Sequence, residues 1–321
     1  MVSRLRPCFL ERQVIQKPWG GRALERHLGG ALPPGAPIGE TWEVFDRKEG
    51  SSRLRGPDTT LAAWMAEARA DLLGAAAPTA DGRFPLIIKF IDAREALSVQ
   101  VHPDDDLARA EGDGGKSEAW VVLEAGPKAR IICGLKPGTQ RAEFARVAHT
   151  SEVEAHLHAF APRVGQAIDV PAGVVHAIGP DVVVYEIQQN SDLTYRLYDW
   201  GRPREVHVEK ALRATNFDVT PCLDASATPT DGGGEWLFRN RAFTLRRFAL
   251  SGPVTLPTEE SFKIATVLTG RGTLGWRSGG EDLPLPLGPG DTVLVPACTG
   301  SVFVSPVGGM TMLWAGPGSD N

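Results

Sequence analysis

The chain has 321 residues, a formal net charge of −5 at pH 7 and a hydrophobic content of 42%. This composition is typical of a soluble globular protein with one large or two medium domains, and the mild negative charge excludes a general nucleic-acid-binding surface. No apolar stretch reaches the length of a membrane span, and residues 1–12 hold three arginines without an apolar core, so neither a membrane partner nor a secretory signal is expected. The scattered cysteines (Cys8, Cys133, Cys222 and Cys298) predict reduced thiols in a cytoplasmic protein.

Helical patterns are confined to two stretches. Apolar residues recur at helical spacing from Thr59 to Leu73 and Gly74 follows, which predicts a helix over about 58–74. The stretch 141–160 predicts one or two short helices, with a capping box over Ser151–Glu154. His156 and His158 would then lie on different helix faces, so we interpret them as surface histidines and not as a metal-binding pair.

Most of the remaining chain consists of short β-like runs between glycine and proline turns, a pattern typical of a sandwich or barrel. The expected strands are Phe84–Ile91, Leu97–His102, Ala119–Glu124, Ala129–Cys133, Val182–Gln188, Thr194–Tyr198, Ala242–Leu250, Lys263–Leu268, Asp291–Val295 and Met310–Trp314. Residues 221–234, which end in Asp-Gly-Gly-Gly, have the composition of a connector.

The chain also repeats itself, because Gly165–Ala172 aligns with Gly290–Ala297. Both segments read as a turn, a strand and a Pro-Ala turn, and they resemble the cupin barrel. We therefore predict a mainly β fold with two cupin-type (jelly-roll) β-barrels and a small helical element. The expected domains are a catalytic one over 1–220 and, after the connector, a second barrel over 235–321. The alignment puts Ser301 in the place of His176, and Phe262 or Lys263 in the place of Glu118, so the second barrel is expected to lack metal ligands.

Strict alternation of polar and apolar residues distinguishes Leu97–Pro103 from the other strands. Successive side chains of a strand face opposite sides, so Ser98, Gln100 and His102 share one polar face. Glu118 and His176 lie in equally strand-like segments bounded by turns. One amide oxygen, two imidazoles and one carboxylate suit a borderline divalent ion such as zinc.

Several motifs in order resemble type I phosphomannose isomerases. They are Lys17–Gly21, Pro37–Glu43, Leu97–Asp105, Lys116–Trp120, Pro171–Gly179 and Glu186–Arg196. The resemblance implies a zinc-dependent aldose–ketose isomerase that interconverts D-mannose 6-phosphate and D-fructose 6-phosphate, with one Zn²⁺ per chain. The family's zinc ligands fall on Gln100, His102, Glu118 and His176, its essential arginine on Arg196, and its active-site lysine and aspartate on Lys116 and Asp192.

The sequence departs from larger family members in two places. Only the short stretch 141–160 stands where they carry a helical insertion, which indicates the short bacterial branch. The turn after Arg196 lacks their phosphate-side lysine, and Arg202 and Arg204 are the available substitutes. Lys89 interrupts the apolar run Leu86–Ile91, where a lysine is costly unless paired, so we expect it to reach the phosphate together with Ser98.

The isomerisation moves a proton between C1 and C2 through an enediol, which requires a base and positive charge near the developing oxyanion. Arg196 is expected to stabilise charge, because a guanidinium does not readily deprotonate. Lys116 should share a strand face with Glu118 and lie beside the ion. For Asp192 two roles stay open, namely holding Lys116 or Arg196 in place and acting as the base.

Other functions are compatible with the same fold. One is a metal-dependent cupin isomerase of another or an unphosphorylated sugar, motivated by the missing phosphate-side lysine. Another is a non-catalytic sugar-binding cupin, against which the trio of Lys116, Asp192 and Arg196 argues. An iron-dependent dioxygenase fits less well because of the Gln-x-His start. The expected assembly is a monomer or homodimer.

Overall fold

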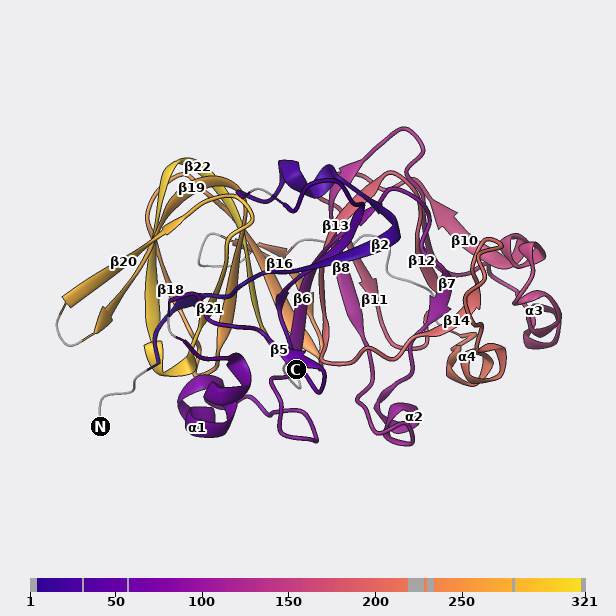
Figure 1. Cartoon of the computed structure of the whole chain (residues 1–321), viewed down its shortest axis with the longest axis horizontal. Coiled ribbons are helices and arrows are strands. Elements are labelled where there is room, and N and C mark those ends of the chain that lie inside the picture. The colour runs from indigo at the N-terminus through magenta and orange to yellow at the C-terminus, as the bar shows by residue number, and fades with distance from the viewer. Residues whose placement is uncertain are drawn as a thin grey trace.

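The structure is a computed structural model that describes residues 5–30, 32–56, 58–218, 228–229, 234–278 and 281–318. It is mainly β with few helices, which agrees with the predicted fold class. Figure 1 shows two β regions side by side, with the orange and yellow strands of the C-terminal part at one end and helices α3 and α4 beyond the strands at the other. Among the described residues, none of the helices is both long and apolar enough to cross a membrane.

Three sheets make up most of the molecule. Sheet I contains β2 (Gln13–Gly21), β3 (Ile38–Val44), β6 (Leu86–Ala93), β8 (Glu118–Ala125), β11 (Ala167–Val170) and β13 (Val182–Gln189). Sheet II contains β7 (Val99–Val101), β9 (Ile131–Leu135), β10 (Leu157–Phe160), β12 (His176–Ile178) and β14 (Tyr195–Tyr198). Sheet III contains β1 (Cys8–Phe9), β15 (Thr228–Pro229), β16 (Gly234–Arg239), β17 (Phe243–Leu250), β18 (Val254–Pro257), β19 (Lys263–Ser278), β20 (Glu281–Leu287), β21 (Thr292–Val295) and β22 (Ser301–Pro317).

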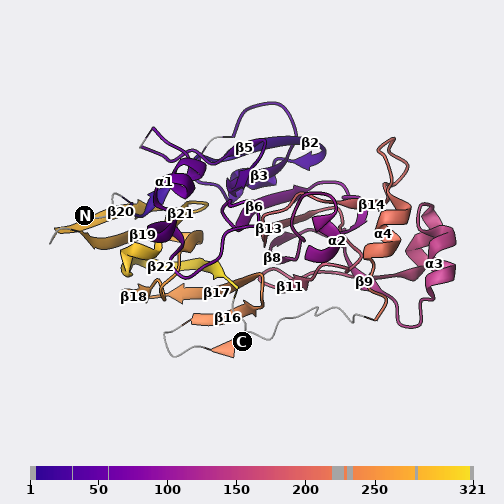
Figure 2. The ribbon, with the colours of Figure 1, turned by 90° about the horizontal axis from the view of Figure 1, so that it is seen from below.

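The remaining elements are short and lie at the ends or between strands. They are the pair β4 (Asp46–Arg47) and β5 (Gly50–Ser51), helices α1 (Leu61–Leu73), α2 (Asp105–Arg109), α3 (Arg141–Val147) and α4 (Val208–Ala214), and the 3₁₀ turns η1 (Ala23–Arg26), η2 (Ser151–His156) and η3 (Ala297–Thr299). Seen from below, α2, α3 and α4 lie on the side of the molecule away from sheet III (Figure 2).

Helix α1 confirms the first predicted helix and its two ends. The Thr60 side chain accepts a hydrogen bond from the Ala63 amide at 3.2 Å, which satisfies one of the free amides of the first turn. Gly74 ends the helix with φ 61°, a conformation that glycine adopts without steric cost. The buried Leu61 and Leu72 attach the helix to the largest apolar cluster of the protein.

The stretch 141–160 differs from the prediction at its C-terminal end. Helix α3 and turn η2 are present, but Leu157–Phe160 forms β10 and pairs with β9. The cap of η2 is Thr150, whose hydroxyl accepts from the Glu152 amide at 3.3 Å, and not Ser151. Pairing with β9 supplies backbone partners that the local sequence pattern does not reveal, so the strand replaces the helix.

Sheets I and III repeat one strand order. Sheet I runs β11-β8-β13-β6-β3-β2, and six strands of sheet III run β21-β19-β22-β17-β16-β15, so each strand has a counterpart in chain order. The registers match as well, because Glu118 pairs with Val170 while Lys263 pairs with Val295. Since the internal repeat aligns Val170 with Val295, the counterpart of Glu118 is Lys263.

One apolar core joins the two β regions. The largest cluster contains residues of sheet I, of helix α1 and of sheet III, and the rings of Phe84 and Phe262 lie 4.5 Å apart across it. A β-bridge between Gly74 and Ser261 connects the end of α1 to the same place. The predicted connector over 221–234 lies almost entirely outside the described residues, apart from 228–229 and Gly234.

Candidate metal centre and active site

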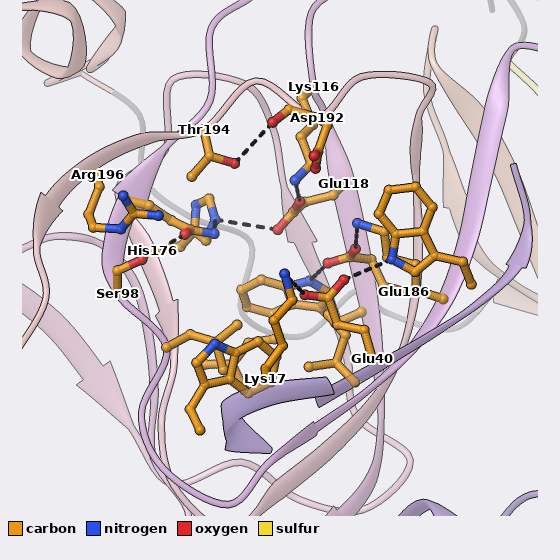
Figure 3. A pocket seen from close by; sticks show the side chains of 18 of the residues that line it. Lys17, Glu40, Ser98, Lys116, Glu118, His176, Glu186, Asp192, Thr194 and Arg196 are labelled. Carbon is orange, nitrogen blue, oxygen red and sulfur yellow. Dashed lines mark hydrogen bonds and ion pairs between the residues drawn. The ribbon is translucent and has the colours of Figure 1, made fainter. Parts of the chain in front are cut away.

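A cavity of about 330 Å³ opens between strands of sheet I and sheet II, and we call it the first cavity. Its wall is mostly polar, and it is lined by Lys17, Trp19, Glu40, Trp42, Lys89, Ile91, Leu97, Ser98, Gln100, Lys116, Glu118, Trp120, His176, Ile178, Glu186, Asp192, Thr194, Arg196 and Arg204. Figure 3 shows Ser98, His176 and Arg196 on one side of this cavity, with Lys17, Glu40 and Glu186 on the other.

Three buried side chains meet beside the first cavity in the arrangement of a metal site, and two of them, Glu118 and His176, line its wall. His102, Glu118 and His176 are each 1% exposed, and their potential ligand atoms all lie within 4.8 Å of one another. Glu118 lies 3.3 Å from Nε2 of His102 through Oε2 and 3.4 Å from Nε2 of His176 through Oε1. Glu118 begins β8, His176 begins β12 and His102 follows β7, so the fold brings together segments that are distant in the chain.

Both imidazoles are held so that Nε2 faces the group. Nδ1 of His102 lies 2.8 Å from the Leu193 carbonyl, and Nδ1 of His176 lies 2.9 Å from the Val174 carbonyl. A carbonyl only accepts, so each Nδ1 carries the proton and each Nε2 presents a lone pair, as is usual for metal-ligating histidines.

Charge and hydrogen bonding at this group also fit a metal ion. Burial, helped by the positive charge of Lys116, lowers the pKa of His102 to about 3, and burial lowers the pKa of His176, so both rings are neutral. Nε2 of His102 and Oε2 of Glu118 are buried without a hydrogen-bond partner in the described part of the chain. Burial would raise the pKa of Glu118, but the positive charge of Lys116 lowers it and keeps this carboxyl ionised. Unpartnered buried ligand atoms of this kind indicate a divalent cation.

Gln100 lies beside the three residues, as the strand alternation predicts. It pairs with His176 across β7 and β12, and its side-chain nitrogen lies 3.3 Å from Nε2 of His176. Ser98 donates to the other end of the amide at 3.1 Å. The amide nitrogen therefore faces the ring nitrogen, and a half-turn of the side chain would direct Oε1 there instead.

The three lysines of the cavity wall each face a carboxylate. Lys116 lies 3.5 Å from Glu118, Lys89 lies 3.5 Å from Glu186 and Lys17 lies 3.5 Å from Glu40. The pairing of Lys89 resolves the question of a lysine in an apolar strand, since Glu186 stands opposite it in the register of β6 and β13. Burial and the charge of Glu118 nevertheless raise the pKa of Glu186 to about 7.

Sequence reasoning missed some of these wall residues as functional groups. Lys17, Glu40 and Glu186 were noted only as parts of motifs. A usable signal was present for Glu186, because a carboxylate inside the apolar run Val182–Ile187 needs a partner as much as Lys89 does.

The arginines after β14 form a positive cluster at one end of the cavity. Arg204 lines the cavity, whereas Arg202 donates to the Ala96 carbonyl at 2.7 Å and is not among the lining residues. Both donate to Asp199, which is 3% exposed. Arg196 donates to the Glu205 carbonyl at 2.7 Å, while its Nε is buried without a hydrogen-bond partner among the described residues. Burial and the charge of Arg204 lower the pKa of Arg196, which shows that its charge is incompletely compensated.

Asp192 also reaches the cavity wall. Within the described residues, no ion pair joins it to Lys116 or to Arg196, and Thr194 donates only to its backbone carbonyl, at 3.5 Å. Its carboxylate is therefore available to a ligand in the cavity.

Comparisons with known proteins agree with one another. The sequence model for "phosphomannose isomerase type I, catalytic domain" matches residues 8–120. The chain is 32% identical to the Bacillus subtilis protein YvyI over 91% of this chain and 93% of that protein. It is 31% identical to the mannose-6-phosphate isomerase of Streptococcus mutans over 84% and 86% of the two chains. The crystal structure of the Bacillus subtilis mannose 6-phosphate isomerase superposes with a TM-score of 0.86 at 29% identity, covering 97% of this chain and 99% of that one.

Proposed function

Because the chain belongs to the type I phosphomannose isomerase family, we propose that it interconverts D-mannose 6-phosphate and D-fructose 6-phosphate. The observation that carries the proposal is the buried group of His102, Glu118 and His176, whose Glu118 and His176 line a cavity that also presents Arg196. The relatives named as mannose-6-phosphate isomerases cover most of the chain, which supports the same activity here.

The proposed metal is Zn²⁺, held by Gln100, His102, Glu118 and His176. Two imidazoles, one carboxylate and one amide oxygen give a set of mainly nitrogen and oxygen donors that suits this ion, with positions left open for substrate. When bound, the ion supplies Lewis-acid polarisation of a substrate oxygen.

For the proton transfer we propose roles for three residues of the wall. Arg196 stabilises negative charge on the enediol, because its guanidinium has a buried, unpartnered Nε. Lys116 faces Glu118 and holds the carboxylate in its ionised form. Of the two roles open to Asp192, its free carboxylate favours that of the base that takes the carbon proton, since it holds neither Lys116 nor Arg196.

The phosphate of the substrate is proposed to lie at the positive end of the cavity. Arg202 and Arg204 share the carboxylate of Asp199, and Arg196 forms no ion pair within the described residues, so a dianion finds surplus positive charge there. This surplus favours a phosphorylated sugar over a free one. Because Arg204 lines the cavity, we propose it as the phosphate contact in place of Arg202, together with Lys89 and Ser98, which also line the wall.

We also propose that the chain forms two cupin barrels, a catalytic one over residues 1–220 and one over 235–321 without metal ligands. The support is the shared strand order and register of sheets I and III.

The test of the function is turnover of mannose 6-phosphate by the purified protein, before and after chelation and after return of zinc, beside an Arg196→Ala variant. We expect turnover that is lost with the chelator, restored by zinc and largely absent in the variant. A folded, zinc-loaded protein without turnover would contradict the proposal. Assays with free mannose separate the phosphorylated from the unphosphorylated substrate.

A further inference from the structure

A second cavity, of about 350 Å³, lies beside sheet III, at the end of that sheet that faces the segment after α1. It is lined by Ala75, Ala76, Trp236, Arg239, Thr244, Glu259, Ser261, Lys263, Pro317 and Gly318. Its volume is at the lower end of the roughly 300–1,000 Å³ of small-molecule sites. None of these residues takes part in the first cavity.

The register of the two sheets shows that the second cavity is built like the first. In sheet I Trp42 pairs with Lys89, and the next pairing after Trp42 is displaced by a bulge. In sheet III Trp236 pairs with Arg246, and a bulge follows at the same place. Lys89 lies over the Trp42 ring at 4.7 Å, and Arg246 lies over the Trp236 ring at 4.3 Å. A tryptophan with a cation over its face has thus been kept in both halves.

The metal-ligand position differs between the two cavities. Glu118 is replaced by Lys263, as the register has shown. Glu118 pairs with Gln188 in sheet I. In sheet III Ile264 pairs with Ala315, so in this antiparallel register the preceding Lys263 lies opposite Gly316, which takes the place of Gln188. A Cβ at Gly316 would lie 3.1 Å from Nζ of Lys263, so the glycine leaves space for the ammonium group. The same strand position therefore carries a carboxylate, Glu118, in the first cavity and a buried ammonium group, Lys263, in the second.

Positive charge exceeds negative charge in the wall of the second cavity. Lys263, whose side chain is 6% exposed, bonds Glu259 at 2.9 Å, and Arg246, which does not itself line the cavity, bonds the same carboxylate. Nε of Arg246 is buried and has no hydrogen-bond partner in the described part of the chain. Arg239 lies over Trp236 at 5.0 Å, and no carboxylate pairs with it among the described residues. Lys263 and Arg246 therefore share one carboxylate, and Arg239 adds a third positive charge beside them.

Two further observations indicate a site and not only a structural ion cluster. Glu259 and Glu260 both have positive φ, 54° and 63°, a strained conformation for residues other than glycine that concentrates at functional sites. Burial lowers the pKa of Lys263 despite its bond to Glu259, so the ammonium is incompletely compensated.

We propose that the second cavity binds a small anion that carries a phosphate group, through Lys263 and Arg239 beside the Trp236 ring. A dianion balances the surplus of two positive charges that Lys263, Arg239 and the neighbouring Arg246 have over Glu259. A metal cation is excluded, because the only carboxylate in the wall already bonds two cations. The inference does not depend on the isomerase activity.

The experiment titrates the full-length protein with inorganic phosphate and follows the indole N–H resonances of the tryptophans by NMR. The Trp236→Phe and Trp42→Phe variants assign the two reporters, one for each cavity. We expect the Trp236 resonance to move with saturation. Arg239→Ala, whose side chain is exposed, should weaken that binding about tenfold or more while leaving the Trp42 response unchanged. The matched control is Arg271→Ala, which removes an exposed arginine of the same sheet that does not line the cavity.

The outcomes are distinct. A Trp236 resonance that stays fixed at saturating phosphate overturns the proposal, as does equal weakening by Arg239→Ala and Arg271→Ala. Lys263→Met, where it folds, should weaken binding further. If the protein does not turn over mannose 6-phosphate but the Trp236 resonance still titrates with phosphate, the proposed activity is rejected and the second site is supported. If the protein is active but the Trp236 resonance does not move, the second site is rejected and the activity is supported.

Discussion

The two β regions share a framework and differ in what they present at one end of it. Sheets I and III have the same strand order, the same register around Glu118 and Lys263, and a bulge after the same tryptophan. Yet two imidazoles and a carboxylate meet at the first cavity, whereas the second is lined by a lysine and an arginine. The strand order and register are thus the same in both regions, while the few side chains that face each cavity differ.

The source of the ligands explains the difference. Gln100, His102 and His176 come from or directly follow sheet II strands, and only Glu118 comes from sheet I. In the second region the internal repeat puts Ser301 at the position of His176. A repeated sheet alone therefore cannot reproduce the metal group, because two of its three members, His102 and His176, lie on or directly after the facing strands.

The largest effect is expected when the first region receives the residue that the second region has at the matching position, which is lysine in place of Glu118. Glu118→Lys places a cation where the proposed Zn²⁺ would bind, so we expect metal content near zero and no measurable turnover. Metal analysis of the purified protein and the mannose 6-phosphate assay give the two readouts. Glu143→Lys, on the exposed face of α3, is the control and should retain both. A metal-loaded, active Glu118→Lys protein would contradict the assignment of the site.

Removal of the positive charge that faces the reacting atoms has the next largest expected effect. Arg196→Ala should lower kcat on the order of 10²–10³-fold, the range for loss of a group that stabilises developing charge. Metal content should stay unchanged, because Arg196 is not a proposed ligand. A loss confined to KM would instead assign Arg196 to substrate binding.

Arg204 and Arg202 offer a matched pair, since both bond Asp199 but only Arg204 lines the first cavity. Arg204→Ala should raise KM for mannose 6-phosphate about tenfold or more, because it removes a charged hydrogen bond to the phosphate. Arg202→Ala should change KM far less. Equal effects in steady-state assays would mean that the two arginines act only through Asp199.

The smallest effect concerns Asp169, whose counterpart in sheet III is the apolar Leu294. Burial raises the pKa of Asp169 to about 6, and its Oδ1 has no hydrogen-bond partner among the described residues. Because the folded-state pKa lies above the unfolded value, this group favours folding at low pH, and that contribution is lost as pH rises from about 4 to about 6.

Asp169→Asn should therefore gain stability over wild type across this interval, on the order of 2–3 kcal/mol by pH 7. Denaturant unfolding of both proteins at several pH values measures the difference. The exposed Asp218→Asn serves as the control. A difference between Asp169→Asn and wild type that does not vary with pH would show that the carboxyl is not desolvated.

Local pattern was sufficient for the parts of the site that depend on strand alternation. The shared face of Ser98 and Gln100, and the position of Lys116 beside Glu118, follow from a period of two residues. The helix at Leu61–Leu73 was predictable from its spacing and from Gly74. The misplaced cap at Ser151 and the missed strand Leu157–Phe160 depend on pairing with β9, which no local pattern contains.

The wall residues that sequence reasoning missed depend on register between distant strands. Glu186 meets Lys89 only because β13 pairs with β6, and Arg204 rather than Arg202 reaches the cavity because of the turn around Asp199. The same holds for the choice of Lys263 over Phe262 as the counterpart of Glu118. A shift of one residue in strand pairing would separate Glu186 from Lys89 and would change the counterpart of Glu118.

The short strand β1 has a consequence for how the protein is made. Cys8 and Phe9 pair with Leu294 and Val293, so a strand from the start of the chain completes the edge of the C-terminal sheet. Ribosomes add about 5–20 residues per second, which means that β1 waits on the order of tens of seconds for its partner during synthesis. Nascent chains should therefore carry an unpaired β1 until translation is nearly complete. Sheet III can then be completed only after β21, one of the last strands to be synthesised, pairs with β1.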